Sequence, residues 1–119
     1  MPCEDLVRRL FDAFFTQDRA VAEQLLADGF TFTSPLDDHL SKGEYFERCW
    51  PNAKRLRDFR IETLVAGDGE VFVRYRAIRV ADGVAFRNTE LIRCAGDRIA
   101  SVEVFFGAEE PTRSPASSS

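Results

Sequence analysis

Hydrophobic residues near the start of the chain recur at helical spacing. Between residues 6 and 15 they fall three or four positions apart, which predicts an amphipathic helix over residues 4–16 with one buried face. Asp18 is a favourable N-cap for a second, shorter helix, and the Asp-Gly pair at 28–29 is a typical helix stop. We therefore expect an N-terminal helical hairpin.

The pattern then changes to strict alternation. Residues 30–34 alternate aromatic or hydroxyl side chains with threonines, which predicts a strand that Pro35 ends. Ser41 and Glu44 have the spacing of a capping box, so a third helix should begin there and end at Pro51. The stretch between this strand and the third helix is polar and contains the only histidine of the chain.

The second half of the chain has the pattern of strands joined by tight turns. Each turn pairs Gly with Asp, as short hairpin connections do. Helices first and strands last predict the α+β class, with three N-terminal helices covering an antiparallel sheet. We expect one domain over residues 1–107 and a disordered tail over residues 108–119. The four predicted strands cover residues 59–66, 71–80, 85–95 and 99–106.

Composition narrows the range of partners. Sixteen basic and twenty acidic residues give a formal charge of −4, which disfavours binding to nucleic acid. The first ten residues lack the basic start of a signal peptide, and no apolar run is long enough to cross a membrane. We expect a cytoplasmic protein without a membrane partner.

The three cysteines are Cys3, Cys49 and Cys94, an odd number at wide spacings. This spacing suggests neither a disulfide framework nor a zinc site, so we expect three reduced thiols, with Cys49 and Cys94 in the core. One histidine near loop carboxylates provides too few ligands for a metal site, so we predict no metal and no other cofactor.

Three segments resemble those of a known superfamily: "FTFTSP" at 30–35, "NTELIRCAGDRI" at 88–99 and "VFFG" at 104–107. With the order of the elements, they make residues 4–107 resemble the nuclear transport factor 2-like superfamily, and most closely its SnoaL-like and ketosteroid-isomerase-like branch. The resemblance implies a sheet curved into a cone around an apolar pocket, which the helices close. Members of the superfamily isomerise steroid ketones, cyclise polyketides, hydrolyse epoxides, dehydrate small molecules, or only bind and scaffold, so the fold does not choose an activity.

The resemblance to the isomerases can be carried over at three positions. Their general base is an aspartate directly before the proline of the first strand, where this chain has Ser34. Their helix tyrosine, which donates to the oxyanion, aligns with Leu10, whereas their protonated acid aligns with Glu90. Because one group of three is kept, we do not expect steroid isomerisation by the family mechanism.

Glu90 is the first candidate for chemistry. Strand alternation puts it on one face with Asn88, and the resemblance identifies this as the pocket face. A carboxyl among apolar side chains resists ionisation, so Glu90 can act as a general acid. Tyr75 and Asn88 are candidate donors to a ligand carbonyl. The alternative is that all three serve only to organise the sheet.

His39 and Asp38 are candidates for a catalytic base. They follow the first strand closely, so they should lie near the pocket rim, and an imidazole titrates near neutral pH. Adjacent residues seldom form such a pair, and acids before a Ser-capped helix are also ordinary loop residues. Both interpretations stay open at this point.

The remaining predictions concern ligand contacts and assembly. A cluster from the helices and the first strand should line an aromatic pocket that favours flat or hydrophobic ligands. The opposite sheet face alternates charge with apolar bulk, which predicts a homodimer with Arg–Glu pairs between the copies. The predicted ligand contacts are Phe14, Phe32, Ser34, Phe46, Trp50, Tyr75 and Asn88, and the predicted dimer face contains Arg74, Arg76, Arg93, Glu103 and Phe105.

Three functions fit these features. The first is a SnoaL-like enzyme that isomerises, cyclises or dehydrates a hydrophobic small molecule by proton transfer, without a cofactor. The second is a non-catalytic module that binds such a molecule, which the missing base and tyrosine favour. The third is a protein-interaction scaffold.

Overall fold

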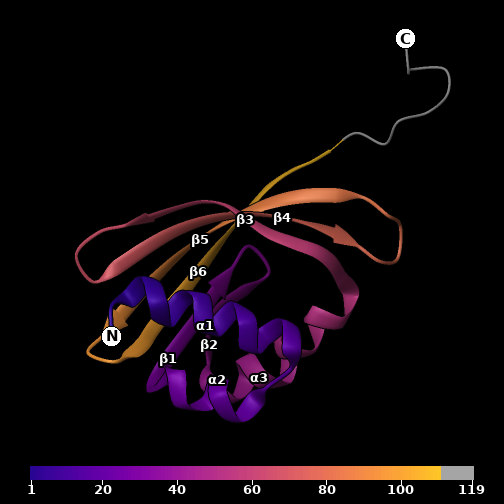
Figure 1. The fold of residues 1–119 in the computed structure, drawn as a ribbon. Coiled ribbons are helices and arrows are strands. Elements are labelled where there is room, and N and C mark those ends of the chain that lie inside the picture. The colour runs from indigo at the N-terminus through magenta and orange to yellow at the C-terminus, as the bar shows by residue number, and fades with distance from the viewer. Residues whose placement is uncertain (111–119) are drawn as a thin grey trace, which may run out of the picture.

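The computed structural model describes residues 1–110 of the chain. The fold is α+β, and the helices lie against the concave side of a curved six-stranded sheet (Figure 1). This confirms the fold class predicted from the sequence. The elements are α1 (Cys3–Thr16), α2 (Arg19–Leu25), β1 (Leu26–Ser34), β2 (Asp37–Ser41), α3 (Lys42–Arg48), the 3-10 helix η1 (Trp50–Arg55), β3 (Leu56–Ala66), β4 (Glu70–Arg79), β5 (Ala85–Ala95) and β6 (Arg98–Glu109).

The sheet has the strand order β2-β1-β6-β5-β4-β3. The last four strands form the expected antiparallel meander. β1 lies beside β6 and pairs with it in parallel, so the sheet is mixed, and the prediction of a wholly antiparallel sheet is wrong at this pair. This pairing brings the first strand, and the hairpin that follows it, next to the last strand, β6.

Helix α1 forms as its pattern predicts. Its buried face carries Leu6, Val7, Leu10 and Ala13, and two acids occupy its first turn, where they favour the positive end of the helix dipole. Gln17 ends the helix in a left-handed conformation, and its side-chain amide donates to the carbonyl of Trp50 at 3.0 Å. The end of α1 is thereby joined to η1.

The segment around the third helix differs in part from the prediction. The capping box of Ser41 and Glu44 is present. The α-helix ends at Arg48, however, and Pro51 lies within η1, because proline fits the first turn of a helix. Residues 37–41, which we had expected as a loop, form β2. A strand at the edge of a sheet can be polar on both faces, so its sequence showed no alternation.

Helix α2 is also shorter than predicted. It ends at Leu25, and the Asp-Gly pair at 28–29 lies inside β1. Leu26 is fully buried at the start of this strand and pairs with Ile99 of β6. Burial against β6 therefore overrides the local helix-stop signal.

The cysteine prediction is wrong for two residues. Cys3, at the start of α1, and Cys94, near the end of β5, form a disulfide with a Cα–Cα distance of 5.8 Å. Their separation of 91 residues hid the pairing, since only the packing of α1 across the sheet brings them together. Cys49 is free and buried, as expected.

The C-terminal boundary also shifts. We predicted a disordered tail from residue 108, but β6 continues to Glu109. Glu110 forms ion pairs with Arg76 at 2.8 Å and Arg87 at 2.7 Å. The rest of the predicted tail, residues 111–119, lies outside the described part of the chain.

Candidate functional site

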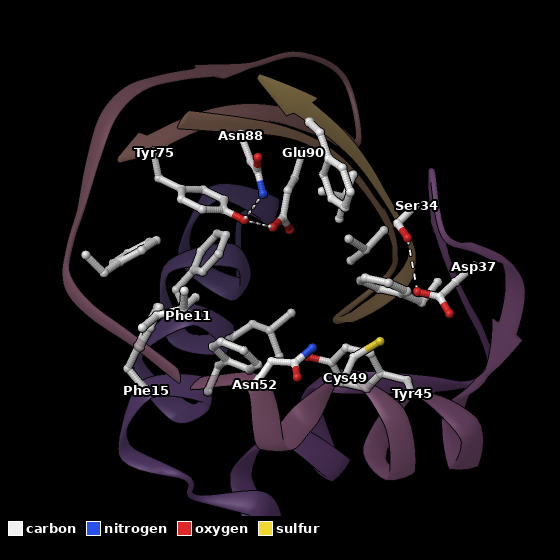
Figure 2. Close-up of a pocket in the computed structure, with 18 of the residues that line it drawn as sticks. Phe11, Phe15, Ser34, Asp37, Tyr45, Cys49, Asn52, Tyr75, Asn88 and Glu90 are labelled. Carbon is white, nitrogen blue, oxygen red and sulfur yellow. Dashed lines mark hydrogen bonds between the residues drawn. The ribbon is translucent and has the colours of Figure 1, made fainter. Parts of the chain in front are cut away.

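A cavity of about 210 Å³ lies between the concave face of the sheet and the helices. Figure 2 shows polar side chains on several sides of this space and aromatic rings from α1 on another. The lining residues come from α1, β1, the β1–β2 turn, β2, α3, η1 and all four strands of the meander. They are Leu10, Phe11, Phe14, Phe15, Phe32, Ser34, Leu36, Asp37, Tyr45, Cys49, Asn52, Leu56, Phe59, Tyr75, Phe86, Asn88, Glu90, Val102, Val104 and Phe106.

Glu90 is the most perturbed acid in this lining. Glu90 is only 9% exposed, and its carboxyl group accepts a hydrogen bond from the hydroxyl of Tyr75 at 2.9 Å. Burial raises the pKa of Glu90 to about 7, and the bond from Tyr75 opposes part of this shift. Glu90 can therefore hold or release a proton near neutral pH.

A directional chain of hydrogen bonds ends at Glu90 (Figure 2). The backbone N–H of Gly107 donates to Asn88 Oδ1 at 3.4 Å, and Asn88 Nδ2 donates to the Tyr75 hydroxyl at 3.3 Å. Tyr75 then donates to Glu90 Oε2. Each hydrogen bond in the chain is donated in the direction of the carboxyl group, so Glu90 Oε2 acts only as an acceptor.

The other carboxyl oxygen of Glu90, Oε1, faces the cavity. Within residues 1–110, every fully buried side-chain oxygen and nitrogen has a hydrogen-bond partner. Glu90 bonds to Tyr75 through Oε2, and among the described residues no protein group forms a hydrogen bond with Oε1. Because Oε1 has no partner, it is not one of the fully buried atoms, and it is open to a ligand in the cavity.

Glycine is required at position 107 for this chain of bonds. A Cβ atom there would lie 2.2 Å from the carbonyl oxygen of Arg87. The β5–β6 register shifts at this point, between Phe86 and Asn88. The close approach of the two backbones brings the Gly107 N–H to the amide of Asn88.

A second carboxyl group lines the cavity at the β1–β2 hairpin. Ser34 and Asp37 pair across a two-residue turn, and the Ser34 hydroxyl donates to Asp37 Oδ2 at 3.0 Å. The N–H of Leu36 donates to the Ser34 oxygen at 3.1 Å. The turn thus holds the serine so that its proton points at the carboxylate.

The charges of both carboxyl groups affect the pKa of the Cys49 thiol. Burial raises the pKa of its thiol to about 11, and the charges of Asp37 and Glu90 add to this shift. The thiol therefore stays protonated at neutral pH and is a poor nucleophile. Tyr45 is similar, because burial and the charge of Glu90 raise the pKa of its phenol.

Aromatic rings form the side of the cavity away from Asp37 (Figure 2). Phe59 of β3 packs on Phe15 and Phe11 of α1, with ring centroids 4.4 and 5.1 Å apart. Tyr75 packs against Phe59 at 5.0 Å. The phenol that bonds to Glu90 is therefore fixed by rings on one side and by Asn88 on the other.

Five of the seven predicted ligand contacts line the cavity. They are Phe14, Phe32, Ser34, Tyr75 and Asn88.

The other two, Phe46 and Trp50, are absent from the lining. Phe46 of α3 and Trp50 of η1 are buried and pack on each other at 5.2 Å, so they belong to the hydrophobic core.

His39 and Asp38 also lie outside the lining. The imidazole Nδ1 of His39 is 2.6 Å from Asp38 Oδ1, but the two side chains are 70% and 91% exposed. The hairpin turns Asp37 inward and Asp38 away, and His39, with a positive φ of 48°, breaks the alternation along β2 that would otherwise return it to the face of Asp37. The pair of catalytic candidates therefore sits in solvent, and the neighbouring Asp37 takes the place at the cavity.

Four polar lining residues were not among the predicted site residues: Asp37, Tyr45, Cys49 and Asn52. For Asp37, the two residues of the Pro35-Leu36 turn were the available signal, since such a turn pairs Ser34 with Asp37. Asn52 lies in η1, which the sequence did not predict.

Within residues 1–110, no group of three or more potential metal ligands is arranged to hold a metal ion. None of the helices described there is long and apolar enough to span a membrane.

The chain belongs to the SnoaL-like domain family, whose pattern it matches over residues 7–102. This agrees with the resemblance found in the sequence. No curated protein matches the chain.

Solved structures of similar fold include proteins described as enzymes. A candidate ketosteroid isomerase from Kribbella flavida has a TM-score of 0.72 and 14% identity, over 92% of this chain and 82% of that one. A candidate polyketide cyclase from Sinorhizobium meliloti has a TM-score of 0.73 and 19% identity, over 84% and 93% of the two chains. AclR from Streptomyces galilaeus, a candidate hydroxylase, has a TM-score of 0.70 and 13% identity, over 87% and 77%. At these identities the likeness concerns the fold alone.

Proposed function

We propose that this protein binds a hydrophobic small molecule in the cavity and catalyses proton transfer on it. The observation that carries the proposal is the buried carboxyl of Glu90, which accepts from Tyr75 through one oxygen and turns the other toward the cavity. Its pKa of about 7 suits a group that exchanges protons near neutral pH. The SnoaL-like family and the isomerase and cyclase descriptions of its structural neighbours support this class of chemistry.

Two carboxyl groups in one cavity allow a division of roles. Protonated Glu90 donates to the carbonyl oxygen of the ligand, while the Asp37 carboxylate removes a proton from the adjacent carbon. The C–H electron pair becomes the C=C bond of an enol, and the carbonyl π electrons form the new O–H bond. Where the ligand is a β,γ-unsaturated ketone, the enol is a conjugated dienol. Return of the proton from Asp37 to the γ carbon, with the O–H proton going back to Glu90, then isomerises the molecule. In this scheme Asp37 replaces Asp38 and His39 as the base.

The test is deuterium exchange into 1-tetralone, a simple ketone with acidic α protons, followed by proton NMR in D₂O. We expect exchange above the buffer rate, falling by at least about 10²-fold in Glu90→Gln and in Asp37→Asn. Asp68→Asn, in the exposed turn after β3, is the matched control and should keep full activity. Exchange in the parent should decline as the pH rises above about 7, because Glu90 then loses the proton that it donates.

The alternative is a binding module without turnover. Ser34 and Leu10 stand where the isomerases have a base and a tyrosine, which favours this alternative. It predicts that 1-tetralone binds but exchanges at the buffer rate in all four proteins. Equal exchange in the parent and in Glu90→Gln would also contradict the enzymatic proposal.

We also propose that the protein forms a homodimer through the convex face of the sheet. Phe72 and Phe105 are 45% and 46% exposed there, on strands β4 and β6. The arginines expected to pair between copies instead contact acids of their own chain, as Arg74 does with Glu62. The apolar side chains therefore carry this proposal.

A cytoplasmic location also remains a proposal, and the disulfide counts against it, since disulfides persist mainly in oxidising compartments.

A further inference from the structure

We infer that Glu110 is a positioning residue for Glu90, although their side chains lie on opposite faces of the sheet. Glu110 holds the end of β6 in place, and this end orients the hydrogen bonds that reach Glu90. The inference rests on the proposed function only in treating Glu90 as the reacting group, because the contacts themselves belong to the folded protein.

The last residues of β6 have no hydrophobic anchor. Val104 is the last buried residue of the strand, and residues 105–109 are all exposed. Backbone bonds to β5 remain, including one from the N–H of Glu110 to the carbonyl of Ala85 at 2.8 Å. Segments with few buried apolar contacts open readily, so side-chain contacts decide whether the end of β6 stays in place.

Two arginines hold the carboxylate of Glu110 on the convex face. Arg76 Nε and Nη2 donate to the two oxygens of Glu110 at 2.8 and 3.1 Å, and Arg87 Nη1 donates to Oε1 at 2.7 Å. Tyr75 and Asn88, next to these arginines in sequence, line the cavity, so alternation puts the arginines on the opposite face. The bonds from Arg76 and Arg87 lower the pKa of Glu110 to about 2, which keeps this acid ionised near neutral pH. We call Arg76, Arg87 and Glu110 the β6 clamp.

A bulge connects the β6 clamp to the cavity side of the sheet. The register shifts between Asn88 and Phe86, so that three steps along β6, from 106 to 109, face two steps along β5. Gly107 lies in this bulge, and its N–H donates to Asn88 Oδ1 at 3.4 Å. This bond is longer than the usual range for N–H···O, so a small displacement of the bulge breaks it. Because Glu110 lies only three residues beyond Gly107, loosening of the clamp displaces the bulge.

The Gly107 N–H sets the direction of the bonds that follow. A backbone N–H can only donate, so it requires the amide of Asn88 to present Oδ1 and to turn Nδ2 toward Tyr75. The Tyr75 oxygen then accepts from Asn88, and its own proton goes to Glu90 (Figure 2). Without the bond from Gly107, the amide can turn over and accept the Tyr75 proton instead. Glu90 then loses the donor that stabilises its ionised form.

Ionisable groups from several elements share the cavity with Glu90. They are Tyr75 of β4, Tyr45 of α3, Cys49 after α3 and Asp37 of β2. Burial raises the pKa of both phenols and of the thiol, so Asp37 is the charged neighbour near neutral pH. The described lining residues of α1 and β3 are all apolar. The bulge and the amide are therefore the route by which the β6 clamp acts on Glu90.

The direction of the pKa change separates this route from a direct effect of charge. Removing the negative charge of Glu110, which leaves its two arginines without a carboxylate, favours ionisation of Glu90 and lowers its pKa. Water that enters at a loosened strand end also lowers it. Loss of the bond from Tyr75 raises it. A rise in Glu110→Gln therefore reports the change in the hydrogen bonds.

The test follows the titration of Glu90 by NMR of its side-chain carboxyl carbon, in the full chain labelled with ¹³C at glutamate. The Glu90→Gln variant assigns the signal. In the parent, the midpoint should lie at about pH 7. In Glu110→Gln the clamp loses its charge-assisted bonds, so the midpoint should rise by about half a pH unit or more.

Two further variants complete the design. Glu103→Gln is the matched control, because it removes the same charge from β6 and leaves the clamp intact, so the midpoint should not rise. Asn88→Leu removes the amide and keeps the approximate size of the side chain, so its own midpoint should rise. Adding Glu110→Gln to Asn88→Leu should then cause no further rise, because both changes act through the same bond.

The outcomes separate this inference from the proposed function. A midpoint that stays constant or falls in Glu110→Gln overturns the inference, even where deuterium exchange into 1-tetralone is observed. A rise that Glu110→Gln still causes in the Asn88→Leu background also overturns it, because the effect would not pass through the amide. The expected midpoints in a protein that exchanges no deuterium support the inference and refute proton transfer. A parent midpoint near the ordinary value of 4.5 overturns both.

Discussion

The buried carboxyl of Glu90 should make the protein less stable as the pH rises. The pKa of Glu90 is raised from 4.5 to about 7 by burial in the folded protein. Between these values the folded protein keeps a proton that the unfolded chain has released, so the free energy of unfolding decreases through this window. A difference of roughly 2.5 pH units at about 1.36 kcal/mol each corresponds to roughly 3 kcal/mol, lost in full above the folded pKa.

Glu90→Gln isolates this contribution, because glutamine has the same shape, cannot ionise, and still offers an oxygen to Tyr75. Urea denaturation of both proteins at pH 5 and pH 8 measures the two free energies of unfolding. Between these pH values, the stability of the variant relative to the parent should increase by roughly 2 to 3 kcal/mol. Other acids titrate alike in both proteins and cancel in the comparison.

Parallel pH profiles for the parent and Glu90→Gln would refute this reasoning, because they would mean that Glu90 ionises equally in both states. Tyr75→Phe is an informative companion variant. It removes a hydrogen bond that lowers the pKa of Glu90, so the pH at which stability is lost should move upward.

Two further predictions concern other parts of the molecule. Reduction of the Cys3–Cys94 disulfide should lower the free energy of unfolding by roughly 4 to 5 kcal/mol, from the chain entropy of a loop of about 90 residues. Thermal denaturation with and without reductant measures this, and a melting temperature that does not respond would contradict it, while Cys3→Ser/Cys94→Ser should be insensitive to reductant. Phe105→Asp should weaken the proposed homodimer by more than tenfold in size-exclusion chromatography with light scattering. A parent that is monomeric at every concentration would contradict the dimer.

The sequence predicted those parts of the fold that depend on local pattern. The helical spacing of residues 6–15, the Ser41 capping box and the Gly-Asp turns each reappear in the structure. β2 and η1 were not predicted, because an edge strand needs no alternation and a short 3-10 helix has little pattern of its own. The parallel pairing of β1 with β6 is a long-range contact that no local signal encodes.

The part of the site that lies on the sheet could be predicted by combining strand alternation with the family resemblance. Together they put Glu90, Asn88 and Tyr75 on the pocket face, and the structure joins these residues by hydrogen bonds. The choice between Asp37 and its neighbour Asp38 depended on the orientation of one hairpin. Because a shift of one residue along a strand reverses the face, adjacent acids could not be distinguished by their identity alone.

The disulfide makes residues 3–94 a covalent ring. A cut anywhere within this ring, for example at the exposed turn around Asp68, leaves two pieces that remain one molecule. One piece would carry the aromatic helix α1 and the Ser34–Asp37 hairpin, and the other the Tyr75, Asn88 and Glu90 side of the cavity. The two halves of the site would stay tethered, so a nicked protein can keep its cavity for as long as the sulfur bridge lasts.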